Sequence, residues 1–331
     1  MRASACVGLL LTLSMMACQR GGAASPPEAG RARRPAWVLV IHGGAGSARP
    51  ESTSPERVTA FTEGLKAALT RGKEILERGG SSVDAVEAVI ATLEDDPAFN
   101  AGKGAVFTHE GRNELDASIM DGATMRCGAV TGVTRVKNPI KLARAVMERS
   151  RHVFFAGEGA ERFAERVGLE LVDPSYFFTQ RRWDALQRAL EKERSAPAGH
   201  GTVGAVALDR EGRLAAGTST GGLTNKATGR IGDSPVIGAG TYADGTAAIS
   251  CTGQGEQFIR YTVARTVAAL VEYKGLTLEQ AAHHVIDDVL RPGDGGLIAV
   301  GADGSVAMVY STPSMLRGVA DADGRFEVAI W

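Results

Sequence analysis

The sequence predicts an α+β fold in which stacked antiparallel sheets are covered by helices on both outer faces. Two observations indicate this arrangement. Downstream of position 202, apolar segments come in pairs joined by short polar turns, which is the pattern of antiparallel hairpins. Segments with helical periodicity come in pairs between the strands, so that each sheet has helices available to cover it.

Composition sets the protein class. The chain has 331 residues, of which 44% are hydrophobic and 23% charged, as expected for a globular protein with a sizeable core. Its formal net charge of −1 gives no reason to expect nucleic acid as a partner. Glycine is abundant, with 42 residues, and aromatic residues make up only 5%, which favours tight turns over an aromatic binding groove.

The N-terminal segment predicts export. Arg2 precedes an apolar run that is too short to span a bilayer but has the length of a signal-peptide core, so residues 1–17 are expected to be a signal peptide. The run ends in Ser14-Met15-Met16-Ala17-Cys18, which resembles a lipoprotein cleavage box with Met15 where Leu is usual. Residues 19–36 are then expected to form a flexible tether. A periplasmic protein is expected, either secreted or membrane-anchored through a lipid on Cys18.

The first half of the mature chain predicts one strand followed mainly by helices. Trp37–Ile41 predicts a buried strand that ends in a glycine turn at 42–46. Apolar residues recur at helical spacing from Val58 to Ile75. Ser82 is expected to cap a second helix, followed by a loop at 93–107 that opens into a strand. Three further helices are predicted at 140–149, 158–167 and 181–194.

The second half predicts hairpins with two long helices between them. Strands are expected at 203–209, 213–218, 246–252, 297–301 and 305–310, and helices at 256–273 and 278–290. No membrane span is predicted after the signal peptide. Cys127 and Cys251 are expected to be small buried residues and not a disulfide, because two cysteines do not make a disulfide framework in a domain of this size. His283 and His284 read as a surface pair and not as metal ligands.

Thr202 is the first candidate for chemistry. It follows a Pro- and Gly-bearing loop and stands at the start of an apolar strand. Cleavage of the Gly201–Thr202 bond would make it an N-terminal residue with both a nucleophilic hydroxyl and a free amine. That amine, with an ordinary pKa of about 8, can serve as the base for its own side chain. By itself the pattern is also that of an ordinary strand threonine.

A competing motif is G-x-S-x-G at Gly217–Gly221, with Ser219 in the position of an α/β-hydrolase nucleophile. His42-Gly43-Gly44-Ala45-Gly46 similarly resembles the oxyanion element of esterases. A nucleophile elbow, however, needs a helix directly after the serine. Residues 221–230 are rich in glycine and turn-forming residues and predict a loop, so this interpretation is rejected.

Several separate segments carry a resemblance that accounts for more of the chain. They are the turn at 42–46, 97–107, 114–122, Thr202, 218–220, Arg230-Ile231-Gly232-Asp233-Ser234-Pro235, Cys251-Thr252-Gly253-Gln254-Gly255-Glu256 and 293–297. Together they resemble the N-terminal-nucleophile (plant-type) asparaginase family, and most of all its isoaspartyl peptidases/L-asparaginases. The resemblance implies a four-layer αββα sandwich of antiparallel sheets. It also implies a precursor that cleaves itself before Thr202 into an α subunit, 37–201, and a β subunit, 202–331.

The implied activity is that of a threonine amidohydrolase activated by autoproteolysis. It hydrolyses β-aspartyl dipeptides and L-asparagine through a β-aspartyl ester and releases L-aspartate. The resemblance assigns the catalytic roles to Thr202 as nucleophile, Thr220 as its hydrogen-bonding partner, and Thr252 and Gly253 as oxyanion donors. It assigns binding of the substrate carboxylate to Arg230 and binding of the substrate ammonium to Asp233. It assigns positioning of the substrate or the precursor carbonyl to Asn100. Ordinary strand threonines and a solvated Arg230–Asp233 surface pair are the structural alternatives.

The resemblance further implies a structural sodium ion but no catalytic cofactor. Backbone carbonyls of the family's loop hold the ion, here at Leu93, Glu94, Asp96, Phe99, Ala101 and Lys103. Asp96 and Lys103 depart from the residues usual there. Two αβ units are expected to associate.

Two other functions stay open at this point. The first is a glycosylasparaginase. Members of that group usually carry Asp before the nucleophile, where this chain has Gly201. Export nevertheless favours this group, and Gln254 stands where isoaspartyl peptidases commonly have Thr. An uncleaved exported binding lipoprotein is the non-enzyme alternative.

Overall fold

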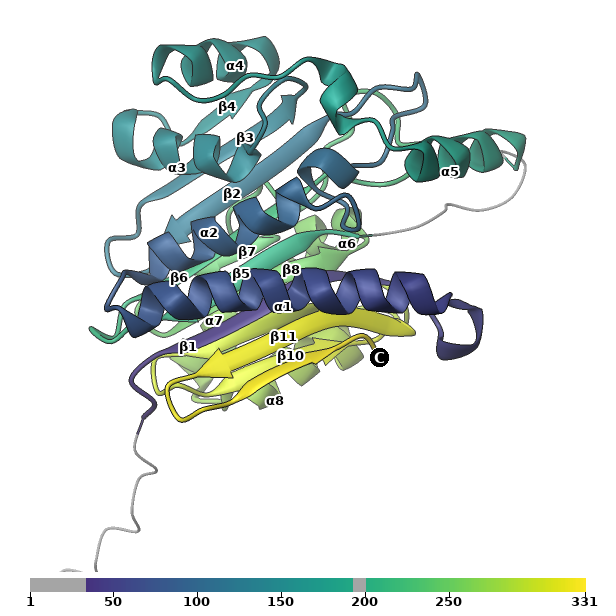
Figure 1. Ribbon diagram of the computed structural model, residues 1–331. Coiled ribbons are helices and arrows are strands. Elements are labelled where there is room, and N and C mark those ends of the chain that lie inside the picture. Colours follow the sequence, from purple (N-terminus) through teal and green to yellow (C-terminus); the bar gives the residue numbers. More distant parts are fainter. Residues whose placement is uncertain (1–33, 193–200) are drawn as a thin grey trace, which may run out of the picture. The chain divides into compact units, whose positions relative to one another are not determined.

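Two sheets form the centre of the computed structural model, which describes residues 34–192 and 201–331 (Figure 1). The predicted signal peptide, the predicted lipidation site at Cys18 and most of the predicted tether therefore lie outside the described residues. The larger sheet contains β1 (Val38–Gly46), β2 (Leu115–Asp121), β3 (Cys127–Val133), β4 (Phe154–Ala156), β5 (Val203–Leu208), β6 (Leu214–Thr220), β11 (Ser314–Asp321) and β12 (Phe326–Ala329). The smaller sheet contains β7 (Thr241–Ala243), β8 (Ala247–Gly253), β9 (Gly295–Gly301) and β10 (Val306–Tyr310).

The strand order explains how the sheets stack. It is β12-β11-β1-β5-β6-β2-β3-β4 in the larger sheet and β10-β9-β8-β7 in the smaller. Neighbouring strands run antiparallel except β3 and β4, which are parallel. Strands β1, β5 and β6 of the larger sheet face β8 and β9 of the smaller. The prediction of stacked antiparallel sheets is thus confirmed, apart from the parallel β3–β4 pair at one edge.

Helices cover the outer face of each sheet, which completes the four αββα layers (Figure 1). The helices are α1 (Pro55–Glu77), α2 (Ser82–Asp95), α3 (Pro139–Arg149), α4 (Gly157–Arg166), α5 (Gln180–Glu191), α6 (Gly255–Arg260), α7 (Val263–Lys274) and α8 (Leu278–His283). Helices α1 to α3 pack on the larger sheet, and α7 and α8 pack on the smaller. Among the described residues, no helix is both long and apolar enough to cross a membrane.

Alternation along β1 divides the core into two layers. Leu39 and Ile41 pack in the layer beneath α1 and α2, whereas Val38 and Val40 pack between the sheets. Successive strand residues point to opposite faces, and both faces of this central strand are covered, so all four side chains are buried.

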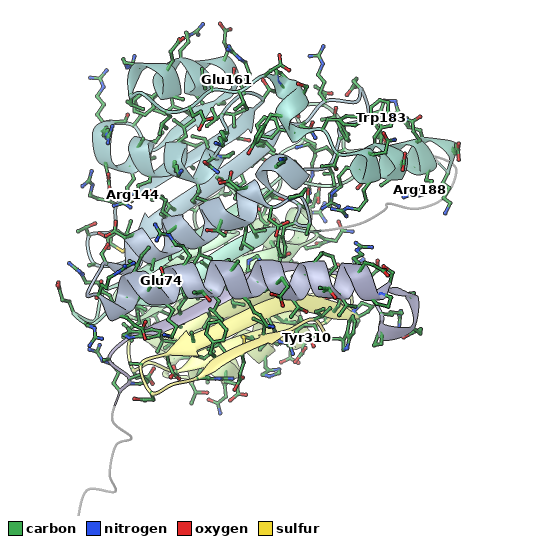
Figure 2. The ribbon with its side chains drawn as sticks, viewed as in Figure 1. Glu74, Arg144, Glu161, Trp183, Arg188 and Tyr310 are labelled. Atoms are coloured by element: carbon green, nitrogen blue, oxygen red, sulfur yellow. The ribbon has the colours of Figure 1, made fainter. Side chains whose placement is uncertain are left out.

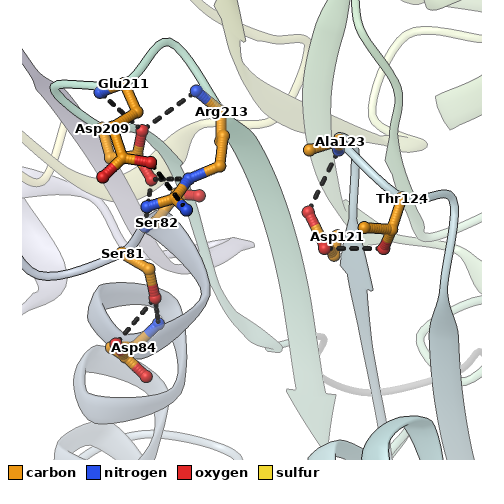
Figure 3. A network of polar contacts seen from close by, with 9 residues as sticks. All are labelled: Ser81, Ser82, Asp84, Asp121, Ala123, Thr124, Asp209, Glu211 and Arg213. Atoms are coloured by element: carbon orange, nitrogen blue, oxygen red, sulfur yellow. Dashed lines mark hydrogen bonds and ion pairs between the residues drawn. The ribbon is translucent and has the colours of Figure 1, made fainter.

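A buried aspartate fixes the start of α2 against the β5–β6 hairpin (Figure 3). Asp209 accepts hydrogen bonds from the backbone N–H of Ser82 at 3.0 Å and from those of Glu211 and Arg213 in the hairpin turn. Ser81, and not the predicted Ser82, is the N-cap, since its hydroxyl accepts the Asp84 N–H at 3.1 Å. The cap prediction was wrong by one residue because Ser82 already belongs to the first helical turn.

The predicted helices are present, but both long helices of the second half are interrupted. The segment predicted as 256–273 breaks between α6 and α7, where Thr262 adopts a left-handed backbone conformation with φ of 45°. Helix α8 continues into a π-helical turn at His284–Val289. His283 and His284 are exposed and pair with Asp287 and Asp288, so the expected surface pair is confirmed.

Other expectations need correction. The region 93–107 does not open into a strand: α2 extends to Asp95, a short 3-10 turn spans Gly102–Gly104, and the next strand is β2 at Leu115. The helix continues because Leu93 and Glu94 are buried against the core. Cys127 and Cys251 are both free, as expected, although Cys127 is only partly buried.

Candidate active site

Thr202 lies immediately before β5, as its place at a loop-to-strand junction predicted. Strands β5 and β6 pair with Val203 opposite Ser219, which brings Thr202 next to the end of β6. There the hydroxyl of Thr202 donates to the hydroxyl of Thr220 at 3.2 Å. Both threonines are buried. Pairing of the two strands therefore places the predicted nucleophile against its predicted partner.

The carbonyl of Gly201, which precedes Thr202, accepts two hydrogen bonds. One comes from the side-chain amide of Asn100 at 2.5 Å and the other from the Thr220 hydroxyl at 3.1 Å. Asn100 is itself held by the Val106 N–H, which donates to its Oδ1 at 2.9 Å, and by the Gly222 carbonyl, which accepts from its Nδ2 at 2.7 Å. Two fixed donors polarise this carbonyl and would stabilise negative charge on its oxygen.

The glycine turn at 42–46 reaches the same peptide bond. Gly44 has a φ of 110°, and a Cβ built on it would lie 2.9 Å from both the Gly201 Cα and the Thr202 nitrogen. Only glycine permits this approach. The N–H of the next residue, Ala45, donates to the hydroxyl oxygen of Thr252 at 3.0 Å. The turn thus links the Gly201–Thr202 bond to Thr252 at the end of β8.

Thr252 has a hydroxyl proton to donate, and Gly253 stands where only glycine fits. The Thr252 oxygen accepts the Ala45 N–H, which leaves its own proton to be donated. Gly253 has a φ of 150°, and a Cβ there would collide with the Asp294 carbonyl oxygen. Residue 253 must therefore be glycine where β8 and β9 approach each other.

His42 is a buried member of this region whose role the sequence did not reveal. Its Nδ1 lies 3.1 Å from the Thr202 carbonyl oxygen and its Nε2 lies 2.9 Å from the Ser250 hydroxyl. A carbonyl can only accept, so Nδ1 carries the proton and Nε2 accepts from Ser250. Burial lowers the pKa of His42 to about 3, with the Thr202 hydrogen bond opposing the shift, and the ring is neutral at ordinary pH.

Arg230 and Asp233 do not form the surface pair considered as an alternative. Arg230 instead forms a bidentate ion pair with Glu256, with Nε–Oε1 and Nη2–Oε2 distances of 2.9 and 2.8 Å. Glu256 was quoted only as part of a motif, because no local pattern pairs it with a residue 26 positions away. The pair holds the guanidinium in a fixed plane, which suits a ligand carboxylate.

Asp233 is buried, and its Oδ2 has no hydrogen-bond partner among the described residues. Burial raises the pKa of this carboxyl to about 7, while the positive charge of Arg230 acts in the opposite direction. A buried carboxylate oxygen without a partner is a costly arrangement that a bound ammonium would relieve.

Comparisons with known proteins agree with this geometry. The model of a family described as asparaginase matches residues 35–330. The chain belongs to this asparaginase family. An isoaspartyl peptidase of Escherichia coli is 47% identical over 294 residues, covering 85% of this chain and 91% of the relative. An isoaspartyl peptidase/L-asparaginase of Mus musculus is 44% identical over 311 residues, covering 91% and 92%. A plant-type L-asparaginase of Thermococcus kodakarensis is 41% identical over 294 residues, covering 84% and 94%.

Membership of the asparaginase family confirms the predicted N-terminal-nucleophile hydrolase fold. The rejected esterase motif has a structural explanation. Ser219 is buried, and its hydroxyl donates to Oε1 of Glu94 at 2.6 Å, an oxygen that also accepts the Ile140 N–H at 3.0 Å. A loop follows β6, as predicted, so the chain has no nucleophile elbow at Ser219.

The loop predicted to hold sodium offers main-chain oxygens. A Cβ on Gly102 would collide with the Glu94 carbonyl oxygen, and one on Gly104 would collide with that of Phe99. The carbonyls of Asp96 and Ala101 already accept N–H groups of Phe99 and Gly104 within the loop. In the described part of the chain, no group of three or more His, Cys, Asp or Glu side chains could hold a metal.

Proposed function

We propose that this asparaginase-family chain is an isoaspartyl peptidase/L-asparaginase that hydrolyses β-aspartyl dipeptides and L-asparagine and releases L-aspartate. The observation that carries the proposal is the hydrogen-bond network of the Gly201 carbonyl, Thr220 and Thr202. It places a nucleophilic hydroxyl beside a peptide carbonyl that two donors polarise. The relatives named isoaspartyl peptidase and L-asparaginase supply the substrate class.

Maturation is the first step of the proposed mechanism. The Thr202 oxygen attacks the Gly201 carbonyl carbon while Asn100 and Thr220 stabilise the negative oxygen. The C–N bond breaks, an ester joins Gly201 to Thr202, and the Thr202 nitrogen takes up the proton lost by the hydroxyl and becomes a free amine. Water hydrolyses the ester, leaving an α subunit that ends at Gly201 and a β subunit of 202–331. A single oxyanion donor contributes about 3–4 kcal/mol to such a step.

Substrate hydrolysis uses the same hydroxyl. With its own amine as base, Thr202 attacks the side-chain amide carbonyl of the substrate, and ammonia or an amino acid departs with the transferred proton. The Thr252 hydroxyl and the Gly253 N–H receive the oxyanion. Water then releases L-aspartate from the β-aspartyl ester, which regenerates the Thr202 hydroxyl.

Recognition of the aspartyl moiety rests on two opposite charges. Arg230, held flat by Glu256, binds the α-carboxylate, and the unpartnered oxygen of Asp233 accepts the α-ammonium. Both groups lie near the β8–α6 turn, since Gly255 approaches the backbone of Asp233 and the guanidinium of Arg230.

Three further features belong to the proposal. A sodium ion would be held by backbone carbonyls of the 93–104 loop. In this loop Gly102 lies close to the Glu94 carbonyl and Gly104 close to the Phe99 carbonyl. The bound ion would fix the loop that carries Asn100. Two αβ units would associate. The N-terminal sequence supports export and attachment through Cys18, which mass analysis of the membrane fraction would detect as an acylated N-terminal peptide.

Intact-mass analysis with N-terminal sequencing tests the nucleophile. A C-terminal fragment that begins Thr202-Val203-Gly204 is the expected result, together with release of L-aspartate from β-aspartyl-leucine and from L-asparagine. Thr202→Ala should stay uncut and inactive. A wild-type chain that stays unbroken over days contradicts the mechanism and favours the binding-protein alternative. A Thr202→Ala variant that cleaves contradicts the assignment of Thr202 as the nucleophile.

A further inference from the structure

A cavity of about 450 Å³ opens on one side of the Gly201–Thr202 bond. Its wall includes Gly43–Gly46 of the glycine turn, Asn100 and Gly201. The groups proposed to bind the aspartyl moiety, Arg230 and Asp233, do not line it. The cavity therefore lies beside Gly201, the residue that precedes the nucleophile, and the proposed recognition of aspartate leaves it unused.

The cavity is lined by positive charge. Arg57 comes from α1, and Arg181, Arg182 and Arg188 come from α5, where Figure 2 labels Arg188. No aspartate or glutamate is among the described residues that line it. Burial lowers the pKa of Arg182 to about 9, and the positive charges of Arg181 and Arg57 add to the effect. Like charges gathered in a partly buried space favour an anionic ligand.

The four arginines divide into two pairs by their contacts. Arg181 donates to the Pro97 and Ala98 carbonyls at 2.9 and 3.1 Å, and Arg182 donates to the Gly104 carbonyl at 2.7 Å. These two hold the loop that carries Asn100. Arg57 lies over the ring of Phe61, and within the described residues neither Arg57 nor Arg188 forms an ion pair. The second pair can therefore meet a ligand without releasing the loop.

We propose that Arg57 and Arg188 bind the carboxylate of the leaving residue of a β-aspartyl dipeptide. The inference rests on the proposed function. Arg230 and Asp233 take the charges of the aspartyl half, so the residue on the far side of the scissile amide must extend beyond Thr202. That residue carries one carboxylate, whereas L-asparagine releases only ammonia. The cavity thus favours peptide substrates with a free C-terminus over the free amino acid.

Steady-state kinetics on fully cleaved enzyme test the proposal. The wild type should hydrolyse β-aspartyl-leucine with a kcat/KM about tenfold above that of its C-terminal amide, an advantage that shrinks as salt is added. Arg188→Gln and Arg57→Gln should each remove most of this advantage while leaving kcat/KM for L-asparagine within about twofold. Arg71→Gln, also on α1 but exposed and outside the cavity, is the matched control and should retain the preference.

The outcomes separate this inference from the function on which it rests. Equal rates for the acid and the amide in the wild type would overturn the carboxylate site and leave the peptidase activity intact. A preference that both glutamine variants keep would also overturn it. If one variant fails to fold or to cleave, the other variant and the wild-type comparison decide. Cleaved wild type that attacks neither the dipeptides nor L-asparagine would contradict the proposed function itself.

Discussion

Asp233 shows, at the scale of a single residue, how burial prepares a carboxyl group for a cationic ligand. Its pKa of about 7 means that at neutral pH only part of the population is ionised. Inhibition by L-aspartate should therefore strengthen as pH rises through about 7, because the ligand ammonium binds the ionised form. Asp233→Asn should lower kcat/KM for L-asparagine at least about 100-fold and still cleave itself, since Asp233 does not contact Gly201. A variant with wild-type kcat/KM would remove Asp233 from the site.

His42 is a positioning residue for the nucleophile. It fixes the carbonyl of Thr202 on one side and Ser250 on the other, and Ser250 in turn contacts the Thr218 hydroxyl at 2.7 Å. His42→Ala should slow self-cleavage about tenfold or more, because Thr202 loses a fixed hydrogen bond in the buried network. Time-resolved mass analysis measures the rate, and circular dichroism checks that the variant is folded.

The pH profile distinguishes this role from proton transfer. With a pKa of about 3, the ring stays neutral above about pH 5, so His42 should contribute no inflection to the cleavage rate between about pH 5 and 8. A cleavage-rate inflection near the ordinary histidine pKa in the wild type, and its absence in His42→Ala, would contradict the assignment.

At the scale of elements, Asp209 joins the start of α2 to the β5–β6 hairpin, and Ser81 caps the same helix end. Ser81→Ala removes the oxygen that accepts the Asp84 N–H and should lower the free energy of unfolding by about 1 kcal/mol. Ser81→Asn, which can cap in the same way, is the matched control and should stay within about 0.5 kcal/mol of the wild type. Urea unfolding measures both. Equal losses in the two variants would mean that the serine acts through packing and not as a cap.

The sequence pattern revealed the amphipathic helices and the strongly apolar strands β1 and β5, and it missed several strands whose residues are small or polar. Helices α1 and α2 were predictable because each presents one apolar face to the larger sheet. Strands β2 and β3 were missed. In β2, Leu115, Ala117 and Ile119 alternate with polar residues, but the sequence does not show that those polar residues are also buried. Strand β3 is rich in small residues and does not alternate. The two C-terminal strands, β11 and β12, were also missed.

Some residues of the candidate site could be predicted from the sequence, and others could not. Thr202, Thr220 and Thr252 stand in recognisable motifs. The structure brings Thr202 against Thr220, and the glycine turn at 42–46 links Thr252 to the Gly201–Thr202 bond. His42 and Glu256 were not assigned roles because their partners, Ser250 and Arg230, lie 208 and 26 residues away. Such pairings follow from strand order and not from spacing.

At the scale of the whole molecule, buried ionisable groups make stability depend on pH in opposing directions. The pKa of His42 is lower in the folded than in the unfolded chain, so its contribution to stability grows as pH rises from about 3 to 6.5. The pKa of Glu94 is raised by burial to about 8, so the folded chain keeps a proton that the unfolded chain has lost. Stability due to Glu94 is therefore present at low pH and is lost as pH rises from about 4.5 to 8.

Glu94→Gln isolates the second effect. A glutamine keeps an oxygen for Ser219 and Ile140 and removes the ionisable proton, so the variant should gain stability relative to the parent as pH rises. The difference in the free energy of unfolding between variant and parent should rise by at most about 1.4 kcal/mol per pH unit between about pH 5 and 8. Urea unfolding in a Thr202→Ala background, which stays a single chain, measures the difference. Glu63→Gln on the exposed face of α1 is the control and should give a flat difference. A flat difference for Glu94→Gln as well would mean that Glu94 is already ionised in the folded protein, with a bound cation compensating its burial.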